Sequence, residues 1–281
     1  MNLKYRNSRN AEATARFWNK SLDKSGWYEI KNVTDEEAEI LIYDYIGWPF
    51  NDPAELIRSL AEMKQKTVTV RINSPGGDVF DGMAIFNALQ SYGSKVITRI
   101  ESLAASAASF IALAGKEVQA YKNAMMMIHE PYVLAVGNQH DLRETAEILE
   151  KINNNMIDIY AANATPGKKE IAQMLKAETW FTAKEAKEKG FVDTILDGKG
   201  AKATFDLSVF ANVPEGMEGN REGRELTERE IERALRDAGA SRSFAKAVAV
   251  RRSGGTEGDQ RDVESLKSSI NAMISTFKGG N

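Results

Sequence analysis

The sequence contains no cysteine and only two histidines, His129 and His140. Without cysteine, disulfides, thiolate metal sites and cysteine nucleophiles are all excluded. The two histidines form no His-x-x-x-His pair, so a zinc site of that kind has no support. We therefore expect no metal and no cofactor, and any chemistry that needs an imidazole must use one of these two side chains.

Long apolar runs and a strong charge bias are missing as well. No segment approaches the roughly 18 apolar residues of a membrane span, and the first residues, MNLKYRNSRN, have no apolar signal core. The formal net charge is -3, which gives no reason to expect nucleic acid or an anionic membrane as a partner. Hydrophobic residues make up 42% and charged residues 27%, as in ordinary soluble proteins. These features predict a cytoplasmic protein.

Strand-like and helix-like segments alternate along most of the chain. The strand-like runs are rich in β-branched and aromatic residues and lie at 39–47, 67–72, 95–100, 117–121, 124–128 and 191–196. The segments with helical spacing or composition lie between them, at 49–66, 79–92, 102–115, 140–160, 169–176 and 183–189. This alternation predicts an α/β fold with largely parallel strand pairing.

The pattern also divides the chain into three expected parts. They are an N-terminal lead-in at 1–37, a main domain at 38–200, and a linker with a helical, partly disordered C-terminal tail at 201–281. The Glu- and Gly-rich stretch 213–226 is typical of a linker. A capping-box pattern opens a helix predicted at 227–239, and a second is predicted at 263–277. Deleting residues 213–281 is therefore expected to leave the main domain functional.

The Ala- and Ser-rich segment 102–115 contains the candidate nucleophile, Ser106. Small residues on both sides let this segment lie close to a sheet and let a peptide backbone approach it. A serine at a helix start also brings its own N–H and the next one beside a reacting carbonyl, at the positive end of the helix dipole. Ser102 and Ser109 compete for the role, and a helix that serves only packing is the alternative.

The candidate base is His129, in the sequence MMMIHEP. An imidazole with an ordinary pKa of about 6.5 accepts a proton at neutral pH. The residue follows an apolar strand-like run and shortly precedes a proline that stops it. A purely structural histidine is the alternative.

The sequence NSPGG at 73–77 is a candidate oxyanion turn between a strand and a helix. Two glycines after a proline permit positive φ angles and expose backbone N–H groups. A plain turn or a phosphate-binding turn is the alternative. However, neither the Gly-x-Gly-x-x-Gly pattern nor a Gly-Lys-Ser/Thr ending is present, so any dependence on ATP would come from another protein.

Four segments in this order resemble successive motifs of the ClpP serine peptidases, namely RINSPGG, AASAASFIALAG, MMMIHEP and ETWFTAKEAKEKGFVDTIL. The resemblance covers about residues 39–196. It implies a ClpP/crotonase-like fold of repeated β-β-α units with a protruding handle helix. It also implies a serine endopeptidase with an acyl-enzyme intermediate, in which Ser106 is the nucleophile and His129 the base. The oxyanion hole would be formed by the N–H groups of Gly77 and Ala107.

The resemblance further implies a substrate site and a third catalytic residue. Peptides bind to this family as an added strand beside the Gly-Gly turn, so the substrate-binding residues would be Gly76, Asp78, Val79, Tyr132 and Val133. The third catalytic residue of the family is an aspartate. Ungapped alignment places Thr179 at its position, with Glu178 one residue earlier. We hypothesise that Glu178 holds the imidazole, and a catalytic pair acting alone is the alternative.

Assembly and biological context are also suggested by resemblance. Segment 140–160 matches the family's handle helix, which interlocks two rings of seven subunits. The resemblance therefore implies a homo-oligomer, and heptameric rings are the family's arrangement. An intramolecular core stripe is the alternative for the apolar residues of this segment. The opening FWNK and the tail ELTEREIERALRDAGASRSFAKAV are similar to phage and prophage head maturation (prohead) proteases, which cut capsid or scaffold precursors.

Three other functions fit parts of the pattern. A peptidase like signal-peptide peptidase A would use a lysine base, and Lys116 and Lys122 lie nearby in the sequence. A crotonase-type acyl-CoA enzyme has similar oxyanion turns but needs no serine nucleophile. A non-catalytic assembly factor would use the fold only to oligomerise, although the presence of both Ser106 and His129 favours an enzyme.

Overall fold

The structure is a computed structural model that describes most of the chain between residues 27 and 217 and a few later positions. The described residues are 27–47, 50–92, 95–133, 135, 137–198, 200, 205–207, 209–215, 217, 232, 236, 242–243 and 246. The chain divides into two compact units, Met1–Glu222 and Gly223–Asn281. In the second unit, Glu232 and Arg236 are helical, within the helix predicted at 227–239. The helix predicted at 263–277 lies outside the described residues.

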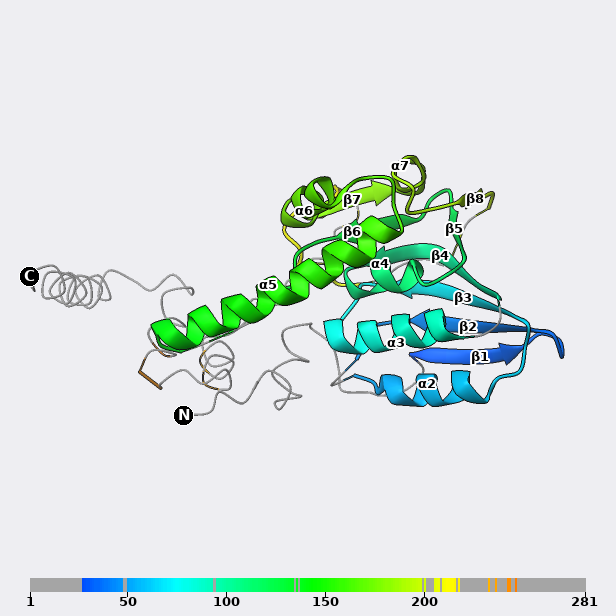
Figure 1. The fold of residues 1–281 in the computed structure, drawn as a ribbon, viewed down its shortest axis with the longest axis horizontal. Coiled ribbons are helices and arrows are strands. Elements are labelled where there is room, and N and C mark those ends of the chain that lie inside the picture. Colours follow the sequence, from blue (N-terminus) through cyan, green and yellow to red (C-terminus); the bar gives the residue numbers. More distant parts are fainter. Residues whose placement is uncertain are drawn as a thin grey trace, which may run out of the picture. The chain divides into compact units, whose positions relative to one another are not determined.

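The described part of the first unit contains a single eight-stranded sheet (Figure 1). Its main path runs through β1 (Tyr28–Asn32), β2 (Glu37–Tyr43), β3 (Thr67–Ser74), β4 (Lys95–Ala105), β5 (Glu117–Tyr121) and β8 (Thr194–Leu196). Off this path, β6 (Met125–Ile128) pairs with β4 and with β7 (Thr179–Thr182). Only the pairs β1–β2 and β6–β7 are antiparallel, so the predicted α/β class with largely parallel pairing is confirmed for the described strands.

The long strand β4 positions the candidate site. It has 11 residues, and its segment Ile97–Ile100 pairs with β5. Its last residues, Leu103–Ala105, pair in parallel with Met125–Met127 of β6. Because parallel neighbours end at the same edge of a sheet, the residues that follow β4 and β6 meet there.

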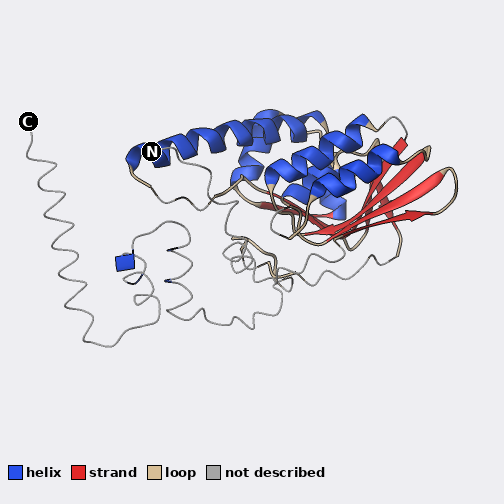
Figure 2. Ribbon diagram, turned by 90° about the horizontal axis from the view of Figure 1, so that it is seen from below, coloured by secondary structure: helices blue, strands red, loops and turns tan. Residues whose placement is uncertain are grey.

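Helices cover one face of this sheet (Figure 2). They are α2 (Pro53–Glu62), α3 (Val79–Ser91), α4 (Ala107–Ala112) and α5 (Gln139–Ala162), with α6 (Lys168–Lys176) and α7 (Ala183–Glu188) beside β7 (Figure 1). The core beneath them is built from alternate strand residues, such as Val68 and Val70, and from helix residues spaced by four, such as Leu56 and Leu60. Among the described helices, none is long and apolar enough to cross a membrane.

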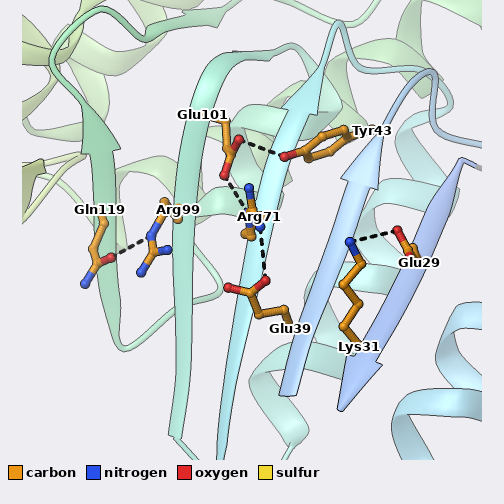
Figure 3. Close-up of polar contacts among 8 residues, drawn as sticks. All are labelled: Glu29, Lys31, Glu39, Tyr43, Arg71, Arg99, Glu101 and Gln119. Atoms are coloured by element: carbon orange, nitrogen blue, oxygen red, sulfur yellow. Dashed lines mark hydrogen bonds and ion pairs between the residues drawn. The ribbon is translucent and has the colours of Figure 1, made fainter. Parts of the chain in front are cut away.

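The opposite face of the sheet carries a polar network (Figure 3). Arg71 of β3 donates a hydrogen bond to Glu101 at 2.5 Å and another to Glu39 at 3.0 Å. The Tyr43 hydroxyl donates to the second carboxylate oxygen of Glu101 at 2.7 Å. The backbone of Gly200 lies against that of Glu101 in β4.

Helix α5 matches the predicted handle segment and projects beyond the sheet at its N-terminal end (Figure 1). Its buried residues are all in its second half, among them Ile152, Met156 and Tyr160. Leu142, near its start, has an exposed fraction of 47%. The predicted apolar stripe is therefore a core stripe only over the second half of the helix.

Three sequence-based expectations are corrected by the structure. The helix expected at 102–115 begins only at Ala107, because residues 102–105 continue β4 and pair with β3 and β6. The sequence patterns predict no element at residues 179–182, where β7 lies, and β1 lies inside the expected lead-in at 1–37. Both are short strands whose antiparallel hydrogen bonds to β2 and β6 stabilise them, which local pattern alone does not reveal.

Candidate active site

Ser106 occupies the sharp turn between β4 and α4. Its backbone has φ 52° and ψ -124°, an unusual conformation for a residue with a side chain. The turn is held by hydrogen bonds, since the Ser106 N–H donates to the Met127 carbonyl at 3.0 Å and its own carbonyl accepts from Ser109. The Ser106 hydroxyl makes no capping bond to α4, which leaves it available to point away from the helix.

His129 follows β6 directly and contacts this serine. Its Nε2 lies 2.8 Å from Ser106 Oγ, and its exposed fraction is only 7%. Burial lowers the pKa of His129 to about 4, and the negative charge of Glu178 offsets part of this effect. The ring is therefore neutral at pH 7, so Nε2 can accept the serine proton.

The candidate oxyanion turn lies against the nucleophile. A Cβ atom added to Gly76, whose φ is +96°, would lie 2.7 Å from Ser106 Cβ and 2.9 Å from the Ala107 nitrogen. Gly77 forms a parallel bridge with Ile46 that uses the carbonyl of Gly76 and the N–H of Asp78. The bridge therefore does not use the N–H of Gly77 itself. The turn and the start of α4 thus lie side by side.

The predicted substrate residues lie on two sides of Ser106 and His129. Tyr132, exposed by 45%, contacts the His129 ring at 5.4 Å between centroids, and Val133 follows it. On the other side, Gly76 belongs to the Gly-Gly turn and Val79 begins α3.

Asp78 is the N-cap of α3, and its carboxylate accepts hydrogen bonds from the N–H groups of Phe80 and Asp81 at 2.9 and 3.0 Å. Its side chain therefore has a structural role in this helix start.

Glu178 lies close enough to influence His129 by its charge, but the two side chains form no hydrogen bond. The Glu178 carboxylate instead accepts the backbone N–H groups of Ala211 and Asn212, at 2.8 and 2.6 Å, and the Trp180 indole N–H at 3.3 Å. Thr179, the aligned position, donates its hydroxyl to the Met174 carbonyl at 2.7 Å. The direct contact between Glu178 and the imidazole that we hypothesised is thus not formed.

Lysine and metal alternatives gain no structural support. Lys122 follows β5, with a side chain exposed by 62% and a long ion pair to Asp197 at 3.9 Å, and Lys116 is exposed just before β5. Neither lysine contacts Ser106, whose hydroxyl partner is His129. Within the described part of the chain, no three His, Asp or Glu side chains gather as metal ligands.

Sequence reasoning missed one part of the site, the segment 205–217. Leu207 and Phe210 are buried together with Leu103, Ala105 and Met127 of β4 and β6. The Phe210 ring also contacts His129, with centroids 5.5 Å apart. The signal in the sequence was the apolar spacing of FDLSVF at 205–210, which we assigned to the linker and tail.

Comparison with known proteins identifies the family. The model of the Clp protease family matches residues 23–199, more than half of the chain. The chain belongs to the Clp protease family. This assignment agrees with the four motifs and with the placement of Ser106 and His129 at neighbouring strand ends.

Individual relatives are similar to this chain over part of their length. An "ATP-dependent Clp protease proteolytic subunit" of Bacteroides fragilis is 33% identical over 133 residues, which cover 47% of this chain and 64% of the relative. A subunit of the same description from Bacteroides thetaiotaomicron is also 33% identical over 133 residues, or 47% and 60% of the two chains. The chain therefore spans less than two thirds of these curated relatives.

A solved structure supports the fold of this chain. The ClpP1 mutant from Listeria monocytogenes aligns with a TM-score of 0.52 and 22% sequence identity, covering 57% of this chain and 91% of that chain. The expected ClpP-like fold is thereby confirmed.

Proposed function

We propose that this Clp protease is a serine endopeptidase with Ser106 as nucleophile and His129 as general base. The observation that carries the proposal is the 2.8 Å distance between Ser106 Oγ and His129 Nε2. Neutral imidazole at this distance is suited to take the serine proton. The description of the curated relatives as proteolytic subunits agrees with this activity.

The reaction proceeds in two halves. Ser106 Oγ attacks the carbonyl carbon of the peptide bond while its proton passes to His129 Nε2, and the charge that develops on the carbonyl oxygen is stabilised by the N–H groups of Gly77 and Ala107. The imidazolium then protonates the leaving amine as the C–N bond breaks. A water molecule, deprotonated by His129, attacks the acyl-enzyme and restores the serine. The negative charge of Glu178 stabilises the imidazolium in both halves.

The substrate is a polypeptide that binds in extended form along the Gly-Gly turn at Gly76–Asp78, facing Tyr132. The protein acts as a homo-oligomer of ring type, in which the projecting half of α5 and its exposed Leu142 contact another subunit. The resemblance of the N- and C-terminal segments to prohead proteases supports capsid or scaffold precursors as the natural substrates. The sequence contains no nucleotide-binding motif, so any dependence on ATP would come from another protein.

Labelling by a fluorophosphonate, followed by mass spectrometry of the modified peptide, tests the proposal directly. We expect the label on Ser106, and we expect Ser106→Ala and His129→Ala to abolish both labelling and peptide hydrolysis. Ser102→Ala is the matched control, because this half-buried serine on β4 lies in the same Ala/Ser segment without contacting His129. Variants of Lys116 and Lys122 should label normally.

The same experiment separates the rival functions. A label on a different residue, or undiminished hydrolysis by Ser106→Ala, would refute the nucleophile. An unlabelled wild-type protein that still assembles would instead favour the non-catalytic assembly factor.

A further inference from the structure

The buried imidazole of His129 is held in an unusual way. Among the described residues its only hydrogen bond is the one between Nε2 and the Ser106 hydroxyl, and no described acceptor receives a bond from Nδ1. In serine hydrolases with a triad, a carboxylate at Nδ1 fixes the tautomer and orientation of the base. Here the Glu178 carboxylate is directed at backbone N–H groups of the segment 211–212. Other contacts must therefore orient the ring.

Two aromatic side chains supply such contacts. The Tyr132 ring meets the imidazole edge to face, with centroids 5.4 Å apart and an interplanar angle of 66°. The Phe210 ring does the same at 5.5 Å and 86°. Edge-to-face pairs of this kind are favourable and directional, so together they restrict rotation of the imidazole. Tyr132 is exposed by 45%, whereas Phe210 is exposed by only 6%, so Phe210 is the better anchored of the two.

Phe210 is fixed on both sides along the chain. Before it, Leu207 is buried in the same apolar cluster as Leu103 and Met127. After it, the N–H groups of Ala211 and Asn212 bind the Glu178 carboxylate, and the Asn212 side chain donates to the Ala177 carbonyl at 2.9 Å. A carboxylate that accepts two backbone N–H groups is a strong anchor, because both hydrogen bonds are charge-assisted.

We propose that Phe210 is a positioning residue for His129, and that Glu178 acts on the imidazole indirectly, by anchoring the backbone that carries Phe210. This inference rests on the proposed function in that it assigns His129 the role of base. It deepens that function because it makes residues 205–212, beyond the segment matched by the family model, part of the catalytic machinery. A chain that lacks this segment would hold its base less firmly.

Removal of the Phe210 ring has a defined chemical consequence. Water would reach the imidazole, and the burial that lowers the pKa of His129 to about 4 would be relieved, so this pKa would rise. The other titratable groups near the ring do not reverse this direction. Glu178 raises the pKa already, Tyr132 is neutral at pH 7, and the Glu130 carboxylate is hydrogen-bonded to Asn153 at 3.2 Å.

The test compares Phe210→Ala with Val213→Ala. Val213 packs against the same apolar cluster but lies outside residues 205–212, and of the two side chains only Phe210 contacts the His129 ring. Histidine labelled with ¹³C at the ε1 position gives two resonances in this protein, and His140→Gln assigns them. The readouts are the titration midpoint of His129 and the rate constant of fluorophosphonate labelling at Ser106.

We expect Phe210→Ala to raise the His129 midpoint by about one pH unit or more. We also expect it to lower the labelling rate about tenfold or more, because the base is no longer held in line with the serine. Val213→Ala should leave the midpoint unchanged. Equal midpoints in the two variants would overturn the proposal.

A second variant allows the test even if the first does not fold. If Phe210→Ala does not fold, Phe210→Leu retains most of the apolar volume while removing the ring edge, and a wild-type midpoint in that variant would overturn the proposal. The titration needs no enzymatic activity. Failure of the wild-type protein to label would therefore count against the peptidase function, while the midpoints would still decide whether Phe210 shields and positions His129.

Discussion

The hydroxyl of Ser106 points to His129 because the backbone around it is constrained. The Ser106 carbonyl accepts hydrogen bonds from the Ser109 N–H at 2.9 Å and from the Ser109 hydroxyl at 2.6 Å. The Ser109 hydroxyl also lies 2.6 Å from the hydroxyl of the buried Tyr160. These bonds offset the cost of the positive φ angle, which is of order 1–3 kcal/mol. They also connect the nucleophile to α5, so the handle helix is coupled to the site through hydrogen bonds.

His129 makes stability depend on pH in a predictable direction. Its pKa is lowered to about 4 in the folded protein, whereas in the unfolded chain it is about 6.5. Between these values the unfolded chain binds more protons, so stability falls as the pH decreases from 6.5 to 4, by about 3 kcal/mol in total. Urea unfolding at several pH values should show this loss in the wild-type protein and a smaller loss in His129→Gln. The same pH dependence in both proteins would contradict the depressed pKa.

Individual residues of the site could be predicted from the sequence to different degrees. Ser106 and His129 lie in motifs with distinctive neighbours, so their contact was anticipated, although their catalytic role stays a prediction. Glu178 was chosen by alignment alone, and its actual partners at Ala211 and Asn212 lie in a segment that appeared to be linker. The contact between Phe210 and His129 joins two residues that are distant in sequence, which no local pattern encodes.

At the scale of secondary structure, β4 shows how tertiary pairing overrides propensity. Residues 102–105 have the Ala/Ser composition of a helix, yet they extend β4 because Leu103–Ala105 pair with Met125–Met127. The extension matters for the site, since it places Ser106 at the junction of strand and helix. The longer strands and helices were predictable because their apolar spacing repeats, whereas β1 and β7 depend on partners distant in sequence.

The close contact between the Gly-Gly turn and the start of α4 should not tolerate a methyl group added at Gly76. In Gly76→Ala the new Cβ would lie 2.7 Å from both the Ala105 carbonyl and Ser106 Cβ, and φ is +96°. We expect the labelling rate of Ser106 to fall about 100-fold, because a displacement of about 1 Å disturbs the nucleophile. Gly167→Ala is the matched control, since no atom lies within 4 Å of its added Cβ. Rates measured on folded protein, checked by circular dichroism, that are equal in the two variants would contradict this view of the turn.

At the scale of the whole molecule, the main question is where the unit that carries the candidate site ends. The sequence suggested a boundary near residue 200, because the motifs stop there and Glu and Gly become frequent. The structure places Leu207 and Phe210 in a buried cluster, with Val213 and Met217 packed against it. The segment 205–217 covers the ends of β4 and β6, so we propose that the functional unit extends through it and that a truncation is better placed at Glu222, where the compact unit ends.

Two truncated chains test this boundary. A chain of residues 1–222 keeps the cluster, so we expect it to unfold with the same urea midpoint as the full-length protein and to label Ser106 at the same rate. A chain of residues 1–204 exposes Leu103 and Met127 and loses the burial of Leu207 and Phe210. At roughly 2 kcal/mol for each of these two side chains, the loss is about 4 kcal/mol, a large fraction of the stability of a typical domain. The shorter chain should therefore be strongly destabilised, and equal stability and labelling in both chains would mean that residues 205–217 are dispensable for fold and site alike.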